Sequence, residues 1–362
     1  MRQQVERSFG LHSLVPLERP CELVRCAETD ADRGTQSSYP PLAMISSATF
    51  KRYGCLRDVT LNLTPLHALI GPNDSGKSTA LRGIETACMF QRPGNSPSDS
   101  AASAFDFLER ARVAGSSPDA TLTGVGLGWT RASWWIPADW LKVPKATALR
   151  LEPEAMRRGW PLIPKAERIR FASSRGAGLP AIYDAILTRN PRAFLAIEER
   201  LKVRFPSVTT LSLENENQSL KALAVSLVDD RVVPASDMSE GLLYYLAMAA
   251  LPHVDDLDVL LLEEPENGLH PARIADVMQS LRDLSKTTQV IMTTHSPLVI
   301  NELQGHEVTL LTRGDGGSRA TLLSETHNYE ERARVYSNGE LWLSYADGKE
   351  EKDLVDRAER TA

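Results

Sequence analysis

The segment that most constrains the fold of this chain is Gly71–Ser78 (GPNDSGKS), which lies between an apolar run and a stretch of helical composition. The apolar run Leu66–Ile70 has the length and character of a buried strand, and the residues from Lys77 to Phe90 suit a helix. A strand, a glycine-bounded loop and a helix N-terminus in this order direct backbone N–H groups at one point, which suits phosphate oxygens. The segment therefore predicts a P-loop in an α/β fold.

The residues of this loop have separate expected tasks in binding ATP. Gly71 and Gly76 permit an approach of backbone to phosphate that a Cβ would obstruct. The Lys77 ammonium is expected to neutralise the β- and γ-phosphates, and the Ser78 hydroxyl to ligate Mg²⁺. The expected nucleotide-binding residues here are Gly71, Asn73, Ser75, Gly76, Lys77, Ser78 and Thr79.

A second motif is the apolar run Val259–Leu262, which ends in the consecutive carboxylates Glu263 and Glu264. A parallel sheet binds its ligand at the carboxyl ends of its strands, so acidic side chains there have the arrangement of a Walker B motif. We expect Glu263 to share the metal site with Ser78, and Glu264 to be the general base that polarises the attacking water. The two motifs together predict an ATPase.

Two shorter motifs accompany these. Met238–Gly241 (MSEG) opens a strongly helical stretch before the Walker B strand, and Thr293–Pro297 (TTHSP) ends the next apolar strand, which places His295 at the same sheet edge. The ordered set "LHALIGPNDSGKSTAL", "GLPAIYDAI", "VPASDMSEGLLYYLAMAAL", "LLLEEPENGLHP" and "QVIMTTHSPLVIN" resembles the ATP-binding-cassette (ABC) ATPases. More narrowly, it resembles the SMC and RecF branch and the OLD-like predicted ATPases of bacteria. The resemblance extends over residues 45–300.

This resemblance implies an α/β fold: a P-loop NTPase of the ABC and SMC-head type, with an antiparallel β subdomain and a helical or α+β insertion. The chain would divide into a flexible leader (1–43), the N-terminal part of the ATPase head with the P-loop (44–135), an inserted lobe (136–235), the C-terminal part of the head with signature, Walker B and His switch (236–325), and a C-terminal tail (326–362). Met44, where strand-like sequence begins, is a candidate start of the natural protein.

The resemblance also implies a site shared between two copies of the chain. ATP would lie between two heads, and a two-fold homodimer follows. One head would contribute Lys77, Ser78, Glu263, Glu264 and His295, and the other would cap the γ-phosphate with Ser239 and Gly241. The turn Asn267–His270 would carry communication between the paired sites.

Three features depart from the family pattern. Glu263 replaces the usual Walker B aspartate, which keeps the charge but adds a methylene to the magnesium ligand. No Q-loop glutamine follows the P-loop helix, since Gln91 is too early, so that part of the magnesium shell has no assigned residue. OLD nucleases carry a C-terminal TOPRIM domain, whereas the segment after Asn301 is too short for one, so we expect this chain not to be the nuclease itself.

Composition narrows the class of protein further. The 362 residues are 42% apolar and 24% charged, which is ordinary for a globular protein. Apolar runs fall far short of the roughly 18 residues of a membrane-spanning helix, and no secretory segment follows Met1, so we expect a cytoplasmic protein without membrane contact. The four cysteines form no CxxC pair and favour reduced, structural thiols over a zinc site. The net charge of -6 argues against a globally basic nucleic-acid binder.

One candidate effector surface is the stretch 140–175, which carries nine basic and three acidic side chains together with Trp140 and Trp160. Basic and aromatic side chains together suit a DNA backbone or a docked partner. A solvated basic face over core tryptophans is the other interpretation. Charge reversal at Arg157 and Arg158 would test for DNA contact.

A second candidate surface is Gly339–Tyr345 (GELWLSY), which is apolar and aromatic and precedes the charged run 349–360. It suits either a docking site for a partner protein or an edge strand followed by a solvated helix.

The leading hypothesis for function is an ATP-gated switch that controls a separately encoded effector, a nuclease or toxin in bacterial defence against phage. A ligand that bridges two protomers binds only the closed state and shifts the population towards it, and hydrolysis by Glu264 resets the switch. The defence role rests on the resemblance alone. Two alternatives are a RecF-like DNA repair or maintenance ATPase that acts on DNA directly, and a non-catalytic scaffold that ATP stabilises.

Overall fold

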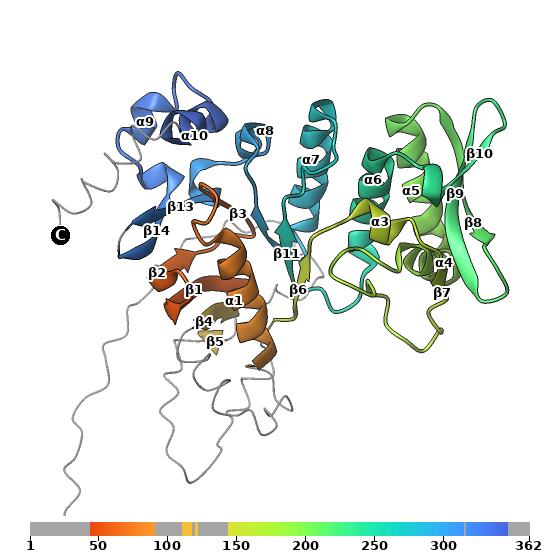
Figure 1. Ribbon diagram of the computed structural model, residues 1–362, viewed down its shortest axis with the longest axis horizontal. Coiled ribbons are helices and arrows are strands. Elements are labelled where there is room, and N and C mark those ends of the chain that lie inside the picture. The colour runs from red at the N-terminus through yellow and green to blue at the C-terminus, as the bar shows by residue number, and fades with distance from the viewer. Residues whose placement is uncertain (1–43, 91–110, 118–119, 122–143, 315, 347–362) are drawn as a thin grey trace, which may run out of the picture. The chain divides into compact units, whose positions relative to one another are not determined.

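The computed structural model describes residues 44–90, 111–117, 120–121, 144–314 and 316–346, which belong to one compact unit of the chain (Figure 1). The expected leader 1–43, the charged run 349–360 and Trp140 lie outside the described residues. Among the helices in the described ranges, none has both the length and the apolar character needed to cross a membrane.

A six-stranded sheet forms the centre of this unit, in the order β14-β13-β3-β12-β11-β6. Neighbouring strands are parallel from β13 to β6, and β14 runs antiparallel to β13. All of β3 and β12 and most of β11 are buried, as strands covered on both faces must be, which explains their continuous apolar runs. The strands are β3 (Leu66–Ile70), β6 (Ala146–Leu149), β11 (Val259–Glu263), β12 (Gln289–Thr293), β13 (Val308–Gly314) and β14 (Gly317–Leu322).

The antiparallel subdomain is a second sheet, in the order β2-β1-β4-β5. The helix that follows the P-loop, α1 (Lys77–Phe90), contributes Leu81 and Ile84 to a core that both sheets share. Phe50 from the antiparallel sheet and Leu261 from the central sheet belong to the same core. The strands are β1 (Met44–Tyr53), β2 (Leu56–Asn62), β4 (Ala111–Ser117) and β5 (Ala120–Thr121).

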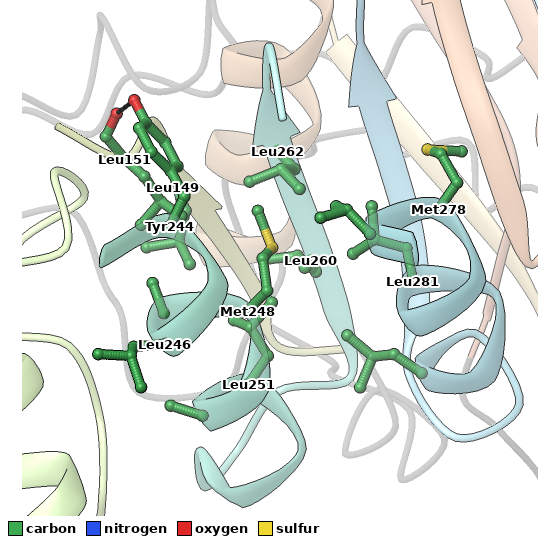
Figure 2. Packing of buried hydrophobic residues seen from close by; sticks show 14 of the residues in the cluster. Leu149, Leu151, Tyr244, Leu246, Met248, Leu251, Leu260, Leu262, Met278 and Leu281 are labelled. Atoms are coloured by element: carbon green, nitrogen blue, oxygen red, sulfur yellow. Dashed lines mark hydrogen bonds between the residues drawn. The ribbon is translucent and has the colours of Figure 1, made fainter. Parts of the chain in front are cut away.

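The other face of the central sheet packs against α6 (Glu240–Ala250) and α7 (Ile274–Leu284). Figure 2 shows Leu260 and Leu262 of β11 among side chains from both helices. Each such leucine is fully buried, and each contributes about 2 kcal/mol relative to exposure. This packing fixes the two helices to the strand that carries the Walker B carboxylates.

The inserted lobe is an α+β unit. Strand β9 pairs with β8, β10 and β7, and α4 and α5 share their core with β8 and β9. Helix α5 begins as expected, with Pro191 at its first position and the Asn190 side chain accepting a hydrogen bond from Ala193 N–H. The elements are α3 (Pro153–Met156), β7 (Trp160–Pro161), α4 (Leu179–Arg189), α5 (Pro191–Arg204), β8 (Val208–Asn215), β9 (Leu220–Leu227) and β10 (Val232–Pro234).

Strand β6 falls within the range 136–235 expected for the lobe, yet it pairs in parallel with β11 of the central sheet. The expected boundary at residue 136 therefore does not coincide with the end of the central sheet. The chain leaves this sheet after Leu149 and returns to it at Val259.

The C-terminal segment is helical, so the alternative of an edge strand at Gly339–Tyr345 is wrong. At the start of helix α10 (Asn338–Ala346), the Glu340 carboxylate accepts hydrogen bonds from the Ser337 N–H and hydroxyl, 2.8 Å each. Its Gly339 N–H donates to Asn301 Oδ1 at 2.6 Å, which anchors α10 to α8 (Pro297–Asn301). The short helix α9 (Tyr329–Arg332) precedes it.

Candidate functional site

The P-loop follows β3 and leads directly into α1, as the sequence predicts. A Cβ on Gly71, which has a φ of 146°, would meet the Leu311 carbonyl oxygen at 2.1 Å, so the loop requires glycine there. The Lys77 ammonium is buried and donates to the carbonyl oxygens of Gly71 (2.9 Å) and Pro72 (2.8 Å). The lysine therefore lies within the concave side of its own loop.

Other loop residues differ in their surroundings. Ser75 is fully buried, and its hydroxyl has no hydrogen-bond partner in the described part of the chain. Asn73 is exposed, and Ser78 and Thr79 are half-buried. Arg313 near the end of β13 forms an ion pair with Asp74 of the loop. Arg313 was not among the site residues expected from the sequence. This ion pair ties the tip of the loop to the central sheet.

The two Walker B carboxylates sit at the end of β11 in different conformations. Glu263 is the last strand residue, and Glu264 has a left-handed φ of 49°, which is uncommon for a residue with a Cβ. The Glu264 N–H donates to the Thr293 carbonyl oxygen at 2.9 Å, and its Oε2 accepts from Asn267 Nδ2 at 2.7 Å. The turn thus fixes the Glu264 backbone and one oxygen of its carboxylate.

His295 follows β12, the strand between β3 and β11. Its backbone N–H donates to Glu266 Oε1 at 3.2 Å, and the Thr294 hydroxyl donates to the same oxygen at 2.6 Å. Glu266 Oε2 is buried and has no hydrogen-bond partner among the described residues. Glu266 was not among the expected site residues, although it lies two residues after Glu264. Its contacts are with the residues that follow β12, which are far away in the sequence.

The charges of Lys77 and Glu264 act on each other's surroundings and on His295. Burial lowers the pKa of Lys77, and the Glu264 carboxylate opposes this shift. Burial and the Lys77 charge lower the pKa of His295, against the opposing effect of Glu264 and Glu266. Both effects favour the neutral imidazole, which can still donate one ring N–H.

The signature segment lies at the N-terminus of α6. Ser239 is the N-cap, and its hydroxyl accepts from Leu242 N–H at 3.4 Å. A Cβ on Gly241 would lie 3.7 Å from the Gly268 carbonyl oxygen, so the turn after the Walker B motif packs beside it. Ser239 is exposed, and no hydrogen bond in the described ranges joins it to the P-loop of the same chain.

Two arginines that the sequence placed only in a basic stretch have specific positions. Arg150, the first residue after β6, has NH1 3.7 Å from Glu263 Oε2. Arg157 donates from NH1 to the carbonyl oxygens of Ser236 (2.7 Å) and Met238 (2.9 Å), just before Ser239. No local sequence signal could have found these contacts, because they join residues far apart in the chain.

The basic stretch is partly neutralised within the chain. Lys145 and Arg168 both form ion pairs with Asp256, and Arg175 NH1 lies 3.6 Å from Glu152 Oε2. The side chain of Arg157 is only 19% exposed, so reversing its charge would disturb the signature segment whether or not DNA binds. Contact with DNA stays a prediction for the exposed Arg158, Lys165 and Arg170.

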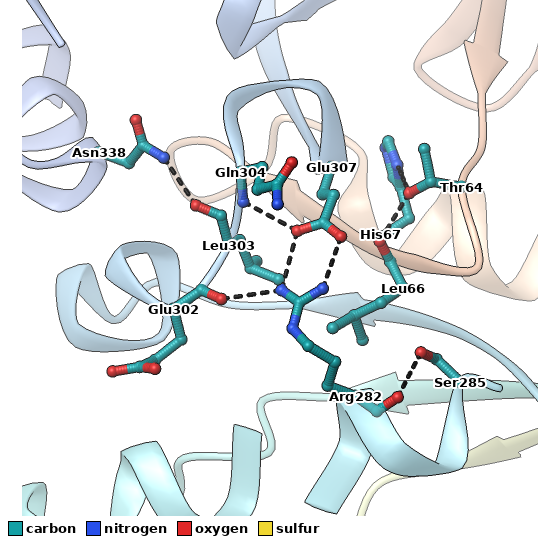
Figure 3. A network of polar contacts seen from close by, with 10 residues as sticks. All are labelled: Thr64, Leu66, His67, Arg282, Ser285, Glu302, Leu303, Gln304, Glu307 and Asn338. Atoms are coloured by element: carbon teal, nitrogen blue, oxygen red, sulfur yellow. Dashed lines mark hydrogen bonds and ion pairs between the residues drawn. The ribbon is translucent and has the colours of Figure 1, made fainter. Parts of the chain in front are cut away.

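A polar network supports the segment that follows His295 and α8 (Figure 3). Arg282 of α7 donates to both carboxylate oxygens of Glu307, at 2.8 and 2.9 Å, and to the Glu302 carbonyl oxygen at 2.9 Å. Burial alone would raise the pKa of Glu307, but hydrogen bonds from Arg282 and from Gln304 N–H outweigh it and lower the pKa. A charged, bidentate pair therefore fixes α7 to the chain after α8.

Models of AAA domains match most of this architecture. Residues 44–112, which include the P-loop, match a family model described as "AAA domain". Residues 139–301, which include the signature segment, the Walker B strand and His295, match one described as "AAA domain, putative AbiEii toxin, Type IV TA system". Two AAA-domain models therefore match separate parts of this chain, and its fold is that of a P-loop ATPase. No curated protein matches the chain.

Solved structures that are similar to this chain include three SMC heads. An SMC head bound to the C-winged helix domain of ScpA is 18% identical, with a TM-score of 0.49, covering 80% of this chain and 99% of that one. The SMC head domain from Thermotoga maritima is 16% identical, with a TM-score of 0.39 and coverage of 77% and 98%. The Pyrococcus furiosus SMC head with an extended coiled coil, bound to the C-terminal domain of ScpA, is 14% identical, with a TM-score of 0.43 and coverage of 80% and 99%. These likenesses are too distant to support a shared activity.

Proposed function

We propose that this ATPase hydrolyses ATP, and that ATP closes two copies of the chain into a dimer that controls a separately encoded effector. The observation that carries the proposal is the convergence of Lys77, Glu264 and His295 at one edge of the central sheet, each acting on the charge of another. That edge is where a parallel sheet binds its ligand.

The loop suits a phosphate chain for two physical reasons. The loop backbone lies so close to β13 at Gly71 that a Cβ would collide with the Leu311 carbonyl oxygen, and the loop leads into the N-terminus of α1, where backbone N–H groups suit an anion. The Lys77 ammonium lies against two loop carbonyls, and phosphate oxygens are stronger acceptors that would draw it outward. Lys77 would then neutralise charge on the β- and γ-phosphates.

The residues present fit a magnesium ion that is shared with the nucleotide. The described residues contain no cluster of three or more His, Cys, Asp or Glu side chains that could hold a metal. Mg²⁺ commonly binds through one or two protein oxygens and substrate phosphates, and Ser78 with Glu263 would supply such a pair. When bound, the ion would neutralise charge that develops on the phosphates during transfer.

Glu264 is the proposed general base for hydrolysis. Its carboxylate is oriented by Asn267, and its left-handed backbone conformation follows the last residue of β11. It would accept a proton from the water that attacks the γ-phosphate. The neutral His295 would donate its N–H to a γ-phosphate oxygen, and Glu266 would hold the backbone of His295 in place.

The dimer follows from the position of the signature segment. Ser239 and Gly241 begin a helix, so their backbone N–H groups suit an anion, yet they form no hydrogen bond with the P-loop of their own chain within the described ranges. A second copy of the chain would bring this helix N-terminus to the γ-phosphate. ATP would then favour the closed dimer because it bridges both copies, and ADP lacks the bridging phosphate.

The proposed effector is a nuclease or toxin in defence against phage. Support comes from the description of the family model that matches residues 139–301, which names a toxin and a toxin–antitoxin system. The controlled effector would be encoded by a separate gene, and its identity can be sought by isolating complexes from the native host.

Steady-state release of phosphate from ATP tests the catalytic part. Lys77→Ala should abolish ATP binding, and Glu264→Gln should keep binding but lower the rate at least about 100-fold, because a general base contributes that much. Glu214→Gln on the exposed end of β8 is the matched control and should keep the wild-type rate. A Glu264→Gln rate equal to that of the control would show that Glu264 is not the general base, and a wild-type protein that binds ATP but releases no phosphate would show that ATP acts only as a structural ligand.

A further inference from the structure

Arg150 occupies a place in the site that no motif assigned. In the parallel pairing of β6 with β11, Leu149 lies opposite Leu262, so the next residues, Arg150 and Glu263, leave their strands side by side. The carboxyl ends of both strands belong to the ligand edge of the sheet. Arg150 therefore stands at the same edge as the Walker B carboxylates, where the sequence offers no glutamine for the magnesium shell.

The guanidinium of Arg150 retains hydrogen-bonding capacity. Its closest carboxylate oxygen, on Glu263, is 3.7 Å away, which is an ion pair but too long for a hydrogen bond. The side chain is 61% exposed, and no other ion pair or hydrogen bond of it occurs within the described ranges. An arginine has five N–H donors in a planar fork that matches phosphate oxygens.

Backbone contacts hold Arg150 in place, whereas its side chain is largely exposed. On one side of the strand, Ala148 N–H donates to Glu85 of α1 at 3.3 Å, which links β6 to the P-loop helix. On the other side, the Arg150 N–H donates to the Ser174 carbonyl oxygen at 2.7 Å. An anchored backbone with an exposed charged side chain suits a residue that reaches onto a ligand.

The segment after Arg150 also contacts the signature helix. The hydroxyl of Tyr244 in α6 donates to the Leu151 carbonyl oxygen at 2.8 Å, as Figure 2 shows. Burial raises the pKa of Tyr244, and the charges that act on its hydroxyl include those of Arg150 and Glu264. Through Arg150 and Leu151 the chain thus contacts both Glu263 and the helix that begins with the signature segment.

We propose that Arg150 is a nucleotide-binding residue that discriminates ATP from ADP by moving its guanidinium from Glu263 onto the γ-phosphate. This inference rests on the proposed function, because it requires that Glu263 and the γ-phosphate share one magnesium ion. A side chain that contacts Glu263 is then next to the phosphate bound to the same ion. The γ-phosphate adds negative charge, and the fork of Arg150 can bind two of its oxygens.

Calorimetric titration with ATP and with ADP, in the presence of Mg²⁺, tests the proposal. The Glu264→Gln background is used so that ATP is not consumed. Arg150→Gln should weaken ATP binding by about 10- to 100-fold, as expected for loss of a charge-assisted contact, and change ADP binding less than about threefold. Arg150→Lys should restore part of the ATP affinity. Arg231→Gln, which removes an exposed ion-paired arginine after β9, is the matched control and should leave both affinities unchanged.

The outcomes distinguish a failure of the Arg150 proposal from a failure of the proposed nucleotide site. If Arg150→Gln weakens ATP and ADP equally, Arg150 acts only by holding Glu263, and the inference is wrong. If neither affinity changes, it is also wrong. If the Glu264→Gln protein binds no ATP, or if Lys77→Ala added to it still binds ATP, the nucleotide site itself is misplaced and both proposals fail.

Discussion

Arg157 should stabilise the protein by holding the segment that leads to the signature helix. Its guanidinium donates two hydrogen bonds, to the carbonyl oxygens of Ser236 and Met238, and its side chain is only 19% exposed. The adjacent Arg158 is exposed, and no ion pair or hydrogen bond of its side chain occurs in the described part of the chain. Arg157→Met keeps the length and apolar stem of the side chain but removes both donors. Arg158→Met is the matched control.

The magnitude follows from the two contacts. A hydrogen bond from a charged donor contributes about 1.5–3 kcal/mol. The Ser236 carbonyl is solvent-exposed, so water replaces most of the loss there, whereas the Met238 carbonyl is partly buried. We therefore expect Arg157→Met to lower the free energy of unfolding by about 2–3 kcal/mol. Arg158→Met should change it by less than about 0.5 kcal/mol, as is usual for an exposed site.

Urea unfolding followed by circular dichroism measures both variants. Equal free energies of unfolding for Arg157→Met and Arg158→Met would refute the assignment of Arg157 to the signature segment. DNA affinity can be measured on the same two variants. If Arg157→Met reduces it and Arg158→Met leaves it unchanged, the reduction comes from the disturbed signature segment and not from a lost contact between Arg158 and DNA. The comparison thus separates a structural arginine from a surface arginine one residue away.

Two further predictions concern a buried histidine and a glycine with a left-handed backbone conformation. Burial lowers the pKa of His67 from 6.5 to about 4, so the unfolded chain binds a proton more readily, and the free energy of unfolding should fall by up to about 3 kcal/mol as the pH drops through that window. Denaturation at several pH values should show this slope in wild type and in the exposed-site control His327→Gln, and a flatter one in His67→Gln. Gly268 has a φ of 72°, and a Cβ there would meet the Tyr244 ring at 2.6 Å, so Gly268→Ala should lower stability by about 2 kcal/mol. Thermal unfolding should show no such loss for Gly316→Ala, where a Cβ meets nothing within 4 Å.

The elements that the sequence predicted best are those whose signal is local. The buried strands β3, β11 and β12 are continuous apolar runs because a parallel sheet is covered on both faces, and such runs are visible without a structure. The start of α5 was also visible, since Asn190 and Pro191 are a cap and a first-turn residue. The motifs that follow β3, β11 and β12 could be located because the strands before them were recognisable.

The features that could not be predicted depend on contacts between residues far apart in the sequence, or on local signals that favour two different structures. Strand β6 is short and half-buried, and only its pairing with β11 makes it part of the central sheet. Arg150 and Arg157 looked alike in a basic stretch, although one lies beside Glu263 and the other holds backbone carbonyls. For α10, the Ser337–Glu340 cap was present in the sequence, but the aromatic and apolar residues after it suggested a strand.

The central claim is that ATP joins two copies of the chain through Ser239 and the P-loop. Light scattering of the Glu264→Gln protein after size-exclusion chromatography, with ATP or with ADP, tests it most directly. We expect the mass of one chain with ADP and twice that mass with ATP, and Ser239→Arg added to this protein should keep ATP binding but prevent the doubling. A mass that stays at one chain with saturating ATP, or that doubles equally with Ser239→Arg, would contradict the account.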